Sequence, residues 1–302
     1  GYVSRVSVSP TGYGLGIYVT HEDGSISVYG HLLEFMKPVA ERVLEEQYSA
    51  ESYKVDLSFS PEEFPVEQGD VIGKSGNSGS SAGPHLHMEI RSDEDTPIDY
   101  LEHGYYNFPD NTPPAFQRVA FYRYEDSTDA VECNLVRMVN FPTGGPVGVI
   151  KLPRRSYVAV DAVDKIEGNP SKLAVETYRV QLDDSQLFKY TVGDVPFSLG
   201  RYIYSLTQSG APGADMINSR VEPGCGLLDR IESENDGIIE LDDDEIHYLR
   251  VEVLDCFGNM NSATFKLQGC DTLNFVRALP DSAARRVVMS WNEPNVIACD
   301  GI

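Results

Sequence analysis

The stretch GPHLHMEI, residues 83–90, places two histidines one residue apart, directly after a loop built almost entirely of Gly, Ser, Asn and Ala. In a β-strand the side chains alternate, so His85, His87 and Glu89 would share one face while the apolar residues between them share the other. The apolar face is then expected to pack on a core. The two imidazoles would lie on the opposite face, with their Cα atoms roughly 7 Å apart. This spacing suits a metal site or acid–base chemistry, and it also suits a half-buried strand whose histidines face water.

The composition disfavours several classes of partner before any motif is considered. The chain has 302 residues, which is enough for about two domains with cores of their own. Its formal net charge of −23 disfavours nucleic acid and anionic membrane surfaces, because both are polyanions that bind clustered Lys and Arg. There is no run of about 18 apolar residues, so no membrane span is expected. These features carry no signal for an oligomeric state.

The five cysteines are spread along the chain without a Cys-x-x-Cys pair. Such spacing is typical of neither a disulfide framework nor a zinc ribbon. We therefore expect buried thiols, and a single bridge between Cys256 and Cys270 stays open.

The first third of the chain has the pattern of antiparallel strands and one helix. Two strands flank the turn at Asp23-Gly24, and alternation along SISVYGHL (25–32) places Tyr29 and His31 on the polar face. The run KPVAERVLEEQY (37–48) has Pro38 at a first helical position and apolar residues near one side, which predicts a surface helix. Strand character returns at residues 53–59, and a short strand precedes the Gly/Ser loop.

A proline-rich segment predicts the boundary between two domains. NFPDNTPP, residues 107–114, holds three prolines in eight residues, which is typical of an interdomain linker. From residue 115 to 269, short runs rich in β-branched and aromatic residues are separated by Gly, Asp, Asn and Pro, which predicts an immunoglobulin-like β-sandwich. Residues 270–302 contain one more strand-like run, RRVVMSW (285–291), and predict the start of a further, incomplete β region. The expected fold class is all-β.

Three motifs follow one another in the first 101 residues: a strand ending in YGHL (29–32), the loop GDVIGKSGNSGSS (69–81) and the run GPHLH (83–87). In this combination the sequence resembles the LytM and lysostaphin type of zinc metalloendopeptidases. The resemblance implies that residues 1–106 form an antiparallel-sheet peptidase domain of the duplicated hybrid motif type. It also implies a zinc-dependent endopeptidase that cleaves the peptide cross-links of bacterial peptidoglycan in the cell envelope or periplasm.

The resemblance gives each histidine of these motifs a role. His87 would be a zinc ligand, whereas His31 and His85 would flank the metal-bound water. Zinc with three protein ligands keeps a fourth position open and lowers the pKa of water there to about 7. The two flanking histidines would orient this nucleophile, stabilise the oxyanion and move a proton to the leaving amine. Tyr29 and Asn77 lie in the same motifs and are expected to bind substrate.

One part of the family pattern is missing from the sequence. The other two zinc ligands of the family come from a His-x-x-x-Asp motif, and none of the six histidines here is followed four places later by Asp. A site with one protein ligand would hardly hold zinc. Either the motif precedes the segment where this chain begins, or the protein is a degenerate relative that uses the groove for binding alone. We favour the first, because the chain also lacks an initiator Met and stops inside a strand-like run.

Two other functions stay open beside the peptidase. A non-catalytic LytM-like module would bind cell-wall peptides or activate a partner amidase, and the β-sandwich is also compatible with carbohydrate binding. The histidines outside the motifs, His21, His103 and His247, are expected to be structural. The run LDDDE (241–245) clusters carboxylates but lacks the glycine and the spacing of a calcium loop, so we expect a solvated turn there.

Overall fold

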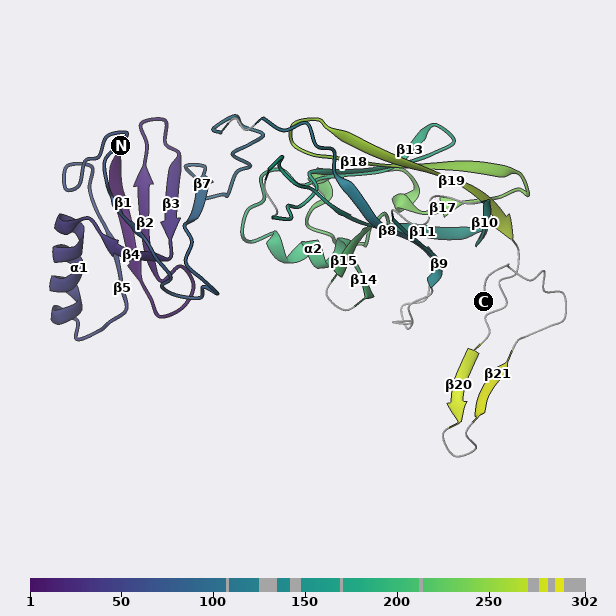
Figure 1. The fold of residues 1–302 in the computed structure, drawn as a ribbon, viewed down its shortest axis with the longest axis horizontal. Coiled ribbons are helices and arrows are strands. Elements are labelled where there is room, and N and C mark those ends of the chain that lie inside the picture. Colours follow the sequence, from purple (N-terminus) through teal and green to yellow (C-terminus); the bar gives the residue numbers. More distant parts are fainter. Residues whose placement is uncertain are drawn as a thin grey trace. The chain divides into compact units, whose positions relative to one another are not determined.

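The computed structural model describes residues 1–106, 109–124, 135–141, 148–168, 171–211, 214–270, 277–281 and 286–290 (Figure 1). The chain divides into two compact units. Unit 1 contains Gly1–Asn107 and Gly193–Gly200, and unit 2 contains Phe108–Val192 and Arg201–Ile302. Both units consist mainly of β-strands in antiparallel sheets, so the all-β prediction is confirmed. None of the helices in these ranges is long and apolar enough to cross a membrane.

Unit 1 is built on a five-stranded antiparallel sheet in the order β5-β1-β2-β3-β7. Its strands are β1 (Tyr2–Val8), β2 (Leu15–Thr20), β3 (Ile26–Gly30), β5 (Val55–Ser58) and β7 (His87–Arg91). A second, two-stranded sheet pairs β4 (Leu32–Phe35) with β6 (Gly73–Ser75). The histidine strand is shorter than expected, because β7 begins at His87. His85 lies before it and makes a single antiparallel bridge to Gly76, since Pro84 between the loop and His85 has no N–H for a ladder.

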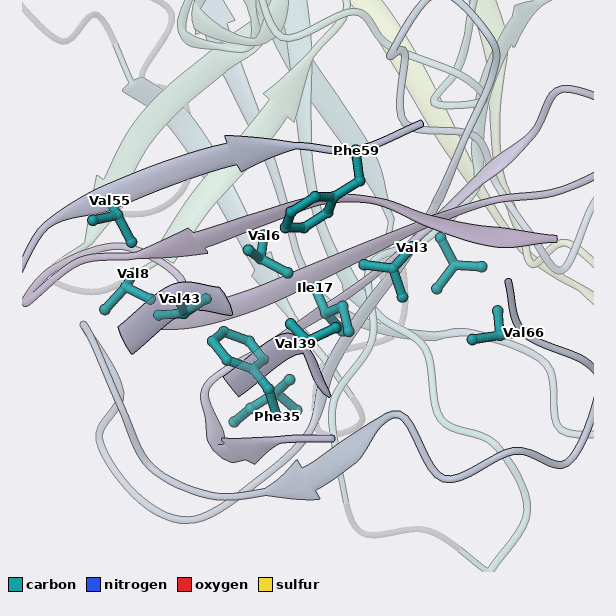
Figure 2. Close-up of a cluster of buried hydrophobic side chains, with 12 residues drawn as sticks. Val3, Val6, Val8, Ile17, Phe35, Val39, Val43, Val55, Phe59 and Val66 are labelled. Atoms are coloured by element: carbon teal, nitrogen blue, oxygen red, sulfur yellow. The ribbon is translucent and has the colours of Figure 1, made fainter. Parts of the chain in front are cut away.

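One helix, α1 (Lys37–Ser49), packs against the unit 1 core and confirms the helix predicted for residues 37–48. Pro38 lies in its first turn, where the missing N–H is not needed. Val39 and Val43 of this helix are buried beside Val6 and Ile17 of the sheet (Figure 2). Each such side chain contributes about 1.5–3 kcal/mol when it is fully buried. The full buried cluster contains Val3, Val6, Val8, Ile17, Val19, Leu32, Phe35, Val39, Val43, Val55, Phe59 and Val66.

Tyr29 alternates with Val28 along β3, but its face is the core face and not the expected polar face. It is opposite Ile17 on β2 and packs against the buried cluster, whereas Val28 is opposite Glu89 on the other face of the sheet. The expectation that Tyr29 points away from the core beside His31 is therefore wrong. The physical reason is that both faces of β3 are buried: Ser27, on the same face as Tyr29, is 2% exposed and Val28, on the other face, is fully buried, so side-chain polarity does not identify the core face. The positive φ of 58° at His31, after the end of β3, separately ends the alternation between Tyr29 and His31.

Unit 2 contains two larger sheets. One has the order β10-β19-β18-β12-β13-β16, and the other has the order β14-β15-β11-β8-β9 with β17 paired to β11. The strands of the first are β10 (Val149–Pro153), β12 (Thr177–Leu182), β13 (Ser185–Thr191), β16 (Ile231–Ser233), β18 (Ile246–Leu254) and β19 (Met260–Cys270). The strands of the second are β8 (Ala115–Arg123), β9 (Leu135–Asn140), β11 (Arg155–Val163), β14 (Thr207–Ala211), β15 (Ala214–Asn218) and β17 (Ile239–Glu240). A short helix, α2 (Ile203–Leu206), precedes β14.

The two sheets of unit 2 meet through buried aromatic side chains. Phe121 of β8 and Phe265 of β19 are both fully buried, and their ring centroids lie 5.3 Å apart. The pair β10 and β19 is parallel, unlike the strictly antiparallel ladders of an immunoglobulin domain. The immunoglobulin-like topology of residues 115–269 stays a prediction.

A separate hairpin follows the larger sheets. It pairs β20 (Arg277–Asp281) with β21 (Arg286–Ser290), and β21 covers most of the strand-like run predicted at residues 285–291. Figure 1 draws this hairpin in yellow.

Candidate active site

The three histidines of the sequence motifs lie together in unit 1. The ring centroids of His31 and His85 are 4.8 Å apart, and those of His31 and His87 are 5.6 Å apart. The prediction that they converge is confirmed. They come from three places in the fold: the residue after β3, the end of the Gly/Ser loop and the first residue of β7.

The pairing of β3 with β7 sets the distance between His31 and His87. Gly30 is opposite His87 in this ladder. A Cβ atom at Gly30 would lie 3.0 Å from the ring of Tyr13 and 3.4 Å from Cβ of His87. A larger residue at position 30 would therefore require the side chains of Tyr13 and His87 to shift.

His31 is held in an unusual backbone conformation by two hydrogen bonds. Its N–H donates to the carbonyl oxygen of Tyr13 at 2.7 Å, and its Nδ1 lies 2.8 Å from the carbonyl oxygen of Ser78. Because a carbonyl oxygen only accepts, Nδ1 carries the proton and Nε2 keeps its lone pair. The side chain is only 6% exposed and the φ angle is 58°. A buried non-glycine residue with positive φ marks a position where the surroundings impose the conformation.

The Gly/Ser loop is fixed to the turn between β1 and β2. Ser78 Oγ accepts the N–H of Leu15 at 2.9 Å and donates to the carbonyl oxygen of Leu32 at 2.7 Å. Gly79 has a φ of 71°, and a Cβ atom there would lie 2.4 Å from the carbonyl oxygen of Gly12. The loop therefore needs both its serine and its glycine to bring the Ser78 carbonyl to His31.

His85 is more open to solvent than His31. Its Nδ1 lies 2.8 Å from the carbonyl oxygen of Gly83 and 3.2 Å from Oγ of Ser81. The carbonyl partner again places the proton on Nδ1 and leaves the lone pair on Nε2. Asn77 accepts a hydrogen bond from Ser81 through Oδ1 at 2.7 Å, so its contact with His85 runs through that serine. The predicted roles of Asn77 and Tyr29 in substrate binding stay predictions.

His87 belongs to a network of charged side chains. Its Nε2 donates to Oε1 of Glu89 at 2.6 Å, and Tyr13 donates to the same oxygen. Arg91, whose side chain is 4% exposed, donates to Oε2 of Glu89 at 2.8 Å and to Asp95 at 2.8 Å. The motifs did not reveal Tyr13 or Arg91 as parts of the site. Alternation from His87 through Glu89 to Arg91 is the one signal that would have found the arginine.

The network keeps Glu89 ionised. Burial by itself would raise the pKa of this carboxyl, but hydrogen bonds from Tyr13, His87 and Arg91 prevail and lower it below its ordinary value. Burial raises the pKa of Tyr13 to about 12, with the hydrogen bond to Glu89 as the second cause. At neutral pH the Tyr13 hydroxyl is therefore a stable donor to a carboxylate.

Part of this site lies in a segment that matches a known protein family. The model of Peptidase family M23 matches residues 57–100, which include the Gly/Ser loop, His85 and His87. This segment belongs to peptidase family M23. The matched residues, called the M23 segment below, contain the end of β5 and all of β6 and β7. His31 and Tyr29 lie outside the match. No curated protein matches the chain.

The M23 segment supplies too few donors for a zinc site by itself. In the part of the chain that the structure describes, no histidine belongs to a group of three ligand residues whose donor atoms lie within 4.8 Å of one another. Zinc in a catalytic site requires three protein ligands. The three imidazoles therefore do not form a zinc site without further donors.

The histidines outside the motifs have partners within the fold. His21 contacts Oγ of Ser27 at 2.8 Å through Nε2. His247 contacts Asp183 at 2.5 Å and Asp243 at 3.0 Å. Asp243 also accepts the backbone N–H of Glu245, as in a solvated turn.

Proposed function

We propose that this chain is part of a zinc-dependent endopeptidase that cleaves the peptide cross-links of peptidoglycan in the cell envelope or periplasm. The observation that carries the proposal is the convergence of His31 and His85 inside a unit whose residues 57–100 match peptidase family M23. Both rings have Nδ1 fixed by a backbone carbonyl and Nε2 left as a base.

The two histidines are suited to different parts of amide hydrolysis. This reaction needs a base that takes a proton from the attacking water and an acid that returns a proton to the leaving amine. Nε2 of His85, on the exposed side of the pair, is suited to exchange protons with water and substrate. Nε2 of His31, held in a buried position, is suited to orient the water and, once protonated, to stabilise the oxyanion.

Zinc would supply Lewis-acid polarisation of the scissile carbonyl. His87 is the proposed zinc ligand in this chain. A further histidine and an aspartate, other than His31 and His85, would have to complete the set of three protein ligands. We therefore expect the 302 residues alone to bind zinc weakly and to hydrolyse peptidoglycan poorly.

The second candidate function is a non-catalytic module that binds cell-wall peptides or activates a partner amidase. It is favoured by one observation, the hydrogen bond that ties Nε2 of His87 to Glu89. A ring nitrogen that donates to a carboxylate is not free to bind a metal in the same state.

Digestion of purified peptidoglycan separates the two candidates. The protein produced by its natural host is incubated with insoluble peptidoglycan, and the new amino groups and the sedimented protein are both measured. The peptidase predicts amino groups that appear with time, stop after chelation and return when zinc is restored. Sedimentation without any release of amino groups would contradict the peptidase and support the binding module.

A further inference from the structure

Three aspartates from distant parts of the sequence meet at one end of unit 2. Asp110 lies in the segment before β8, Asp164 directly follows β11 and Asp255 directly follows β18. One carboxylate oxygen from each lies within 4.8 Å of the other two. The three residues are 8%, 5% and 5% exposed, respectively, so the cluster is inside the unit and not on its surface.

Two oxygens of this aspartate cluster have no hydrogen-bond partner. Oδ1 of Asp110 accepts the N–H groups of Thr112 and Glu167, and both oxygens of Asp255 accept hydrogen bonds from Asn259. Oδ2 of Asp110 and Oδ1 of Asp164 are buried and accept none. Buried polar atoms are almost always paired, so two unpaired oxygens in one cluster are positions where a ligand or a water would bind.

The electrostatics of the cluster point to a cation. In the described ranges no Lys, Arg or His forms an ion pair with Asp110, Asp164 or Asp255. Burial raises the pKa of Asp164, and the charges of Asp255 and Asp110 raise it further. Three carboxylates placed this close in a buried position repel one another, and either a cation among them or protonation of one of them relieves the repulsion.

We propose that Asp110, Asp164 and Asp255 bind a calcium ion. The group offers only oxygen donors, which calcium prefers, whereas zinc prefers nitrogen and sulfur. Two ligands of one calcium ion lie at most about 4.6–5.2 Å apart, twice the Ca–O distance, so three oxygens within 4.8 Å of one another are close enough to share one ion. Magnesium requires shorter distances and near-ideal octahedral geometry, whereas calcium accepts irregular arrangements of oxygens.

The surrounding backbone is already arranged to hold the cluster. The N–H groups of Phe257 and Asn259 fix Asp255, and the side chain of Asn259 donates to the carbonyl oxygen of Asp110 at 3.1 Å. The segment before β8 is thereby joined to the turn between β18 and β19. A calcium ion would add Asp164 at the end of β11 to this junction and make the stability of unit 2 depend on calcium.

The test is thermal unfolding of the full chain after chelation, with and without added calcium, for the wild type and Asp164→Asn. For the wild type we expect calcium to raise the unfolding temperature of unit 2 by about 5 °C or more. Without calcium, Asp164→Asn should unfold at the same temperature as the wild type or higher, because it removes one of three repelling charges. Calcium should leave this variant unchanged. The comparison therefore does not depend on a variant that fails to fold.

The matched control is Asp229→Asn, which removes the same charge from an exposed position. This control should keep the full calcium effect, and hydrogen exchange should show calcium-dependent protection of residues 109–114 and 255–259. The proposal is overturned if calcium does not stabilise the wild type, if Asp164→Asn keeps the effect, or if Asp229→Asn loses it. Equal stabilisation by magnesium at the same concentration would overturn the choice of calcium.

Discussion

The histidine site of unit 1 and the aspartate cluster of unit 2 solve the same problem in different ways. Both gather polar side chains at the ends of strands from three separate segments. In unit 1 the half-buried carboxylate of Glu89 is neutralised within the chain by Arg91, with His87 and Tyr13 as further donors. In unit 2 the carboxylates of the aspartate cluster face one another.

The difference between the two sites lies in whether the carboxylates have positively charged partners within the chain. A site whose charges are paired internally is complete as a structure and uses its open nitrogens for chemistry. A site whose charges are unpaired is incomplete until an ion arrives.

The largest effect is expected on hydrolysis by the natural protein. His85→Ala and His31→Asn should each lower the turnover of peptidoglycan by about 10²-fold or more, because each removes an open Nε2. Asparagine is chosen at position 31 because it tolerates positive φ better than alanine does. The rate of amino-group release measures the effect. His21→Ala is the control and should stay at the wild-type rate, and equal losses in all three variants would show that the histidine site has no special role.

Removal of the Glu89 charge should destabilise unit 1. Glu89→Gln leaves the buried guanidinium of Arg91 with only the exposed Asp95 as a charged partner. The expected loss in the free energy of unfolding is about 2 kcal/mol, on the scale of hydrogen bonds to charged groups. Denaturant unfolding measures it. Asp95→Asn should cost less than about 1 kcal/mol, because that partner lies at the surface.

Loss of one carboxylate charge should change the stability of the two units in different directions. In the presence of a chelator, Glu89→Gln should destabilise its unit, whereas Asp164→Asn should not destabilise unit 2. Destabilisation by both would mean that the aspartate cluster is also paired within the chain.

A smaller effect is expected at the serine that fixes the Gly/Ser loop. Ser78→Ala removes the partners of the Leu15 N–H and the Leu32 carbonyl oxygen, so the unfolding free energy should fall by about 1–2 kcal/mol. Ser80→Ala is the matched control. It removes one exposed hydrogen bond to the N–H of Gly12 and should cost less. Equal losses would contradict the role of Ser78 in holding the loop.

The smallest effect is expected at His247, a histidine that pairs with carboxylates inside unit 2. The hydrogen bond to Asp183 raises the pKa of His247 above its ordinary value. The resulting stability is therefore complete below pH 6.5 and is lost as the pH rises through the folded-state pKa. Its size is less than about 1 kcal/mol, because solvent screens this pair. Denaturant unfolding at pH 6 and pH 9 should show this loss in the wild type and not in His247→Gln.

Much of unit 1 could be predicted from the sequence because its signals are local. Pro38 and the apolar spacing after it indicate α1, and the Asp23-Gly24 turn indicates the pairing of β2 with β3. The convergence of the three histidines followed from motifs that lie within or beside paired strands. Tyr29 was placed on the wrong face because both faces of β3 are buried, and serines on the core face made that face resemble a solvent face.

The aspartate cluster could not be predicted in this way. Its members lie in three segments far apart in the sequence, and only the packing of the two unit 2 sheets brings them together. The run LDDDE is the more obvious acidic cluster in the sequence, yet it forms an exposed turn in which Asp243 contacts His247. The proposal of a bound ion rests on the burial of the three aspartates and on their unpaired oxygens. Both are properties of the folded chain and cannot be read from the sequence.

The assigned roles of His85 and His87 can be separated by the zinc content of the natural protein. Wild type, His87→Ala and His85→Ala are purified, treated briefly with a chelator and measured by elemental analysis. The account predicts that His87→Ala loses its zinc and that His85→Ala keeps it while losing hydrolysis of peptidoglycan. Loss of zinc from His85→Ala together with retention by His87→Ala would contradict the assigned roles, and a wild type without zinc would contradict the proposed metallopeptidase.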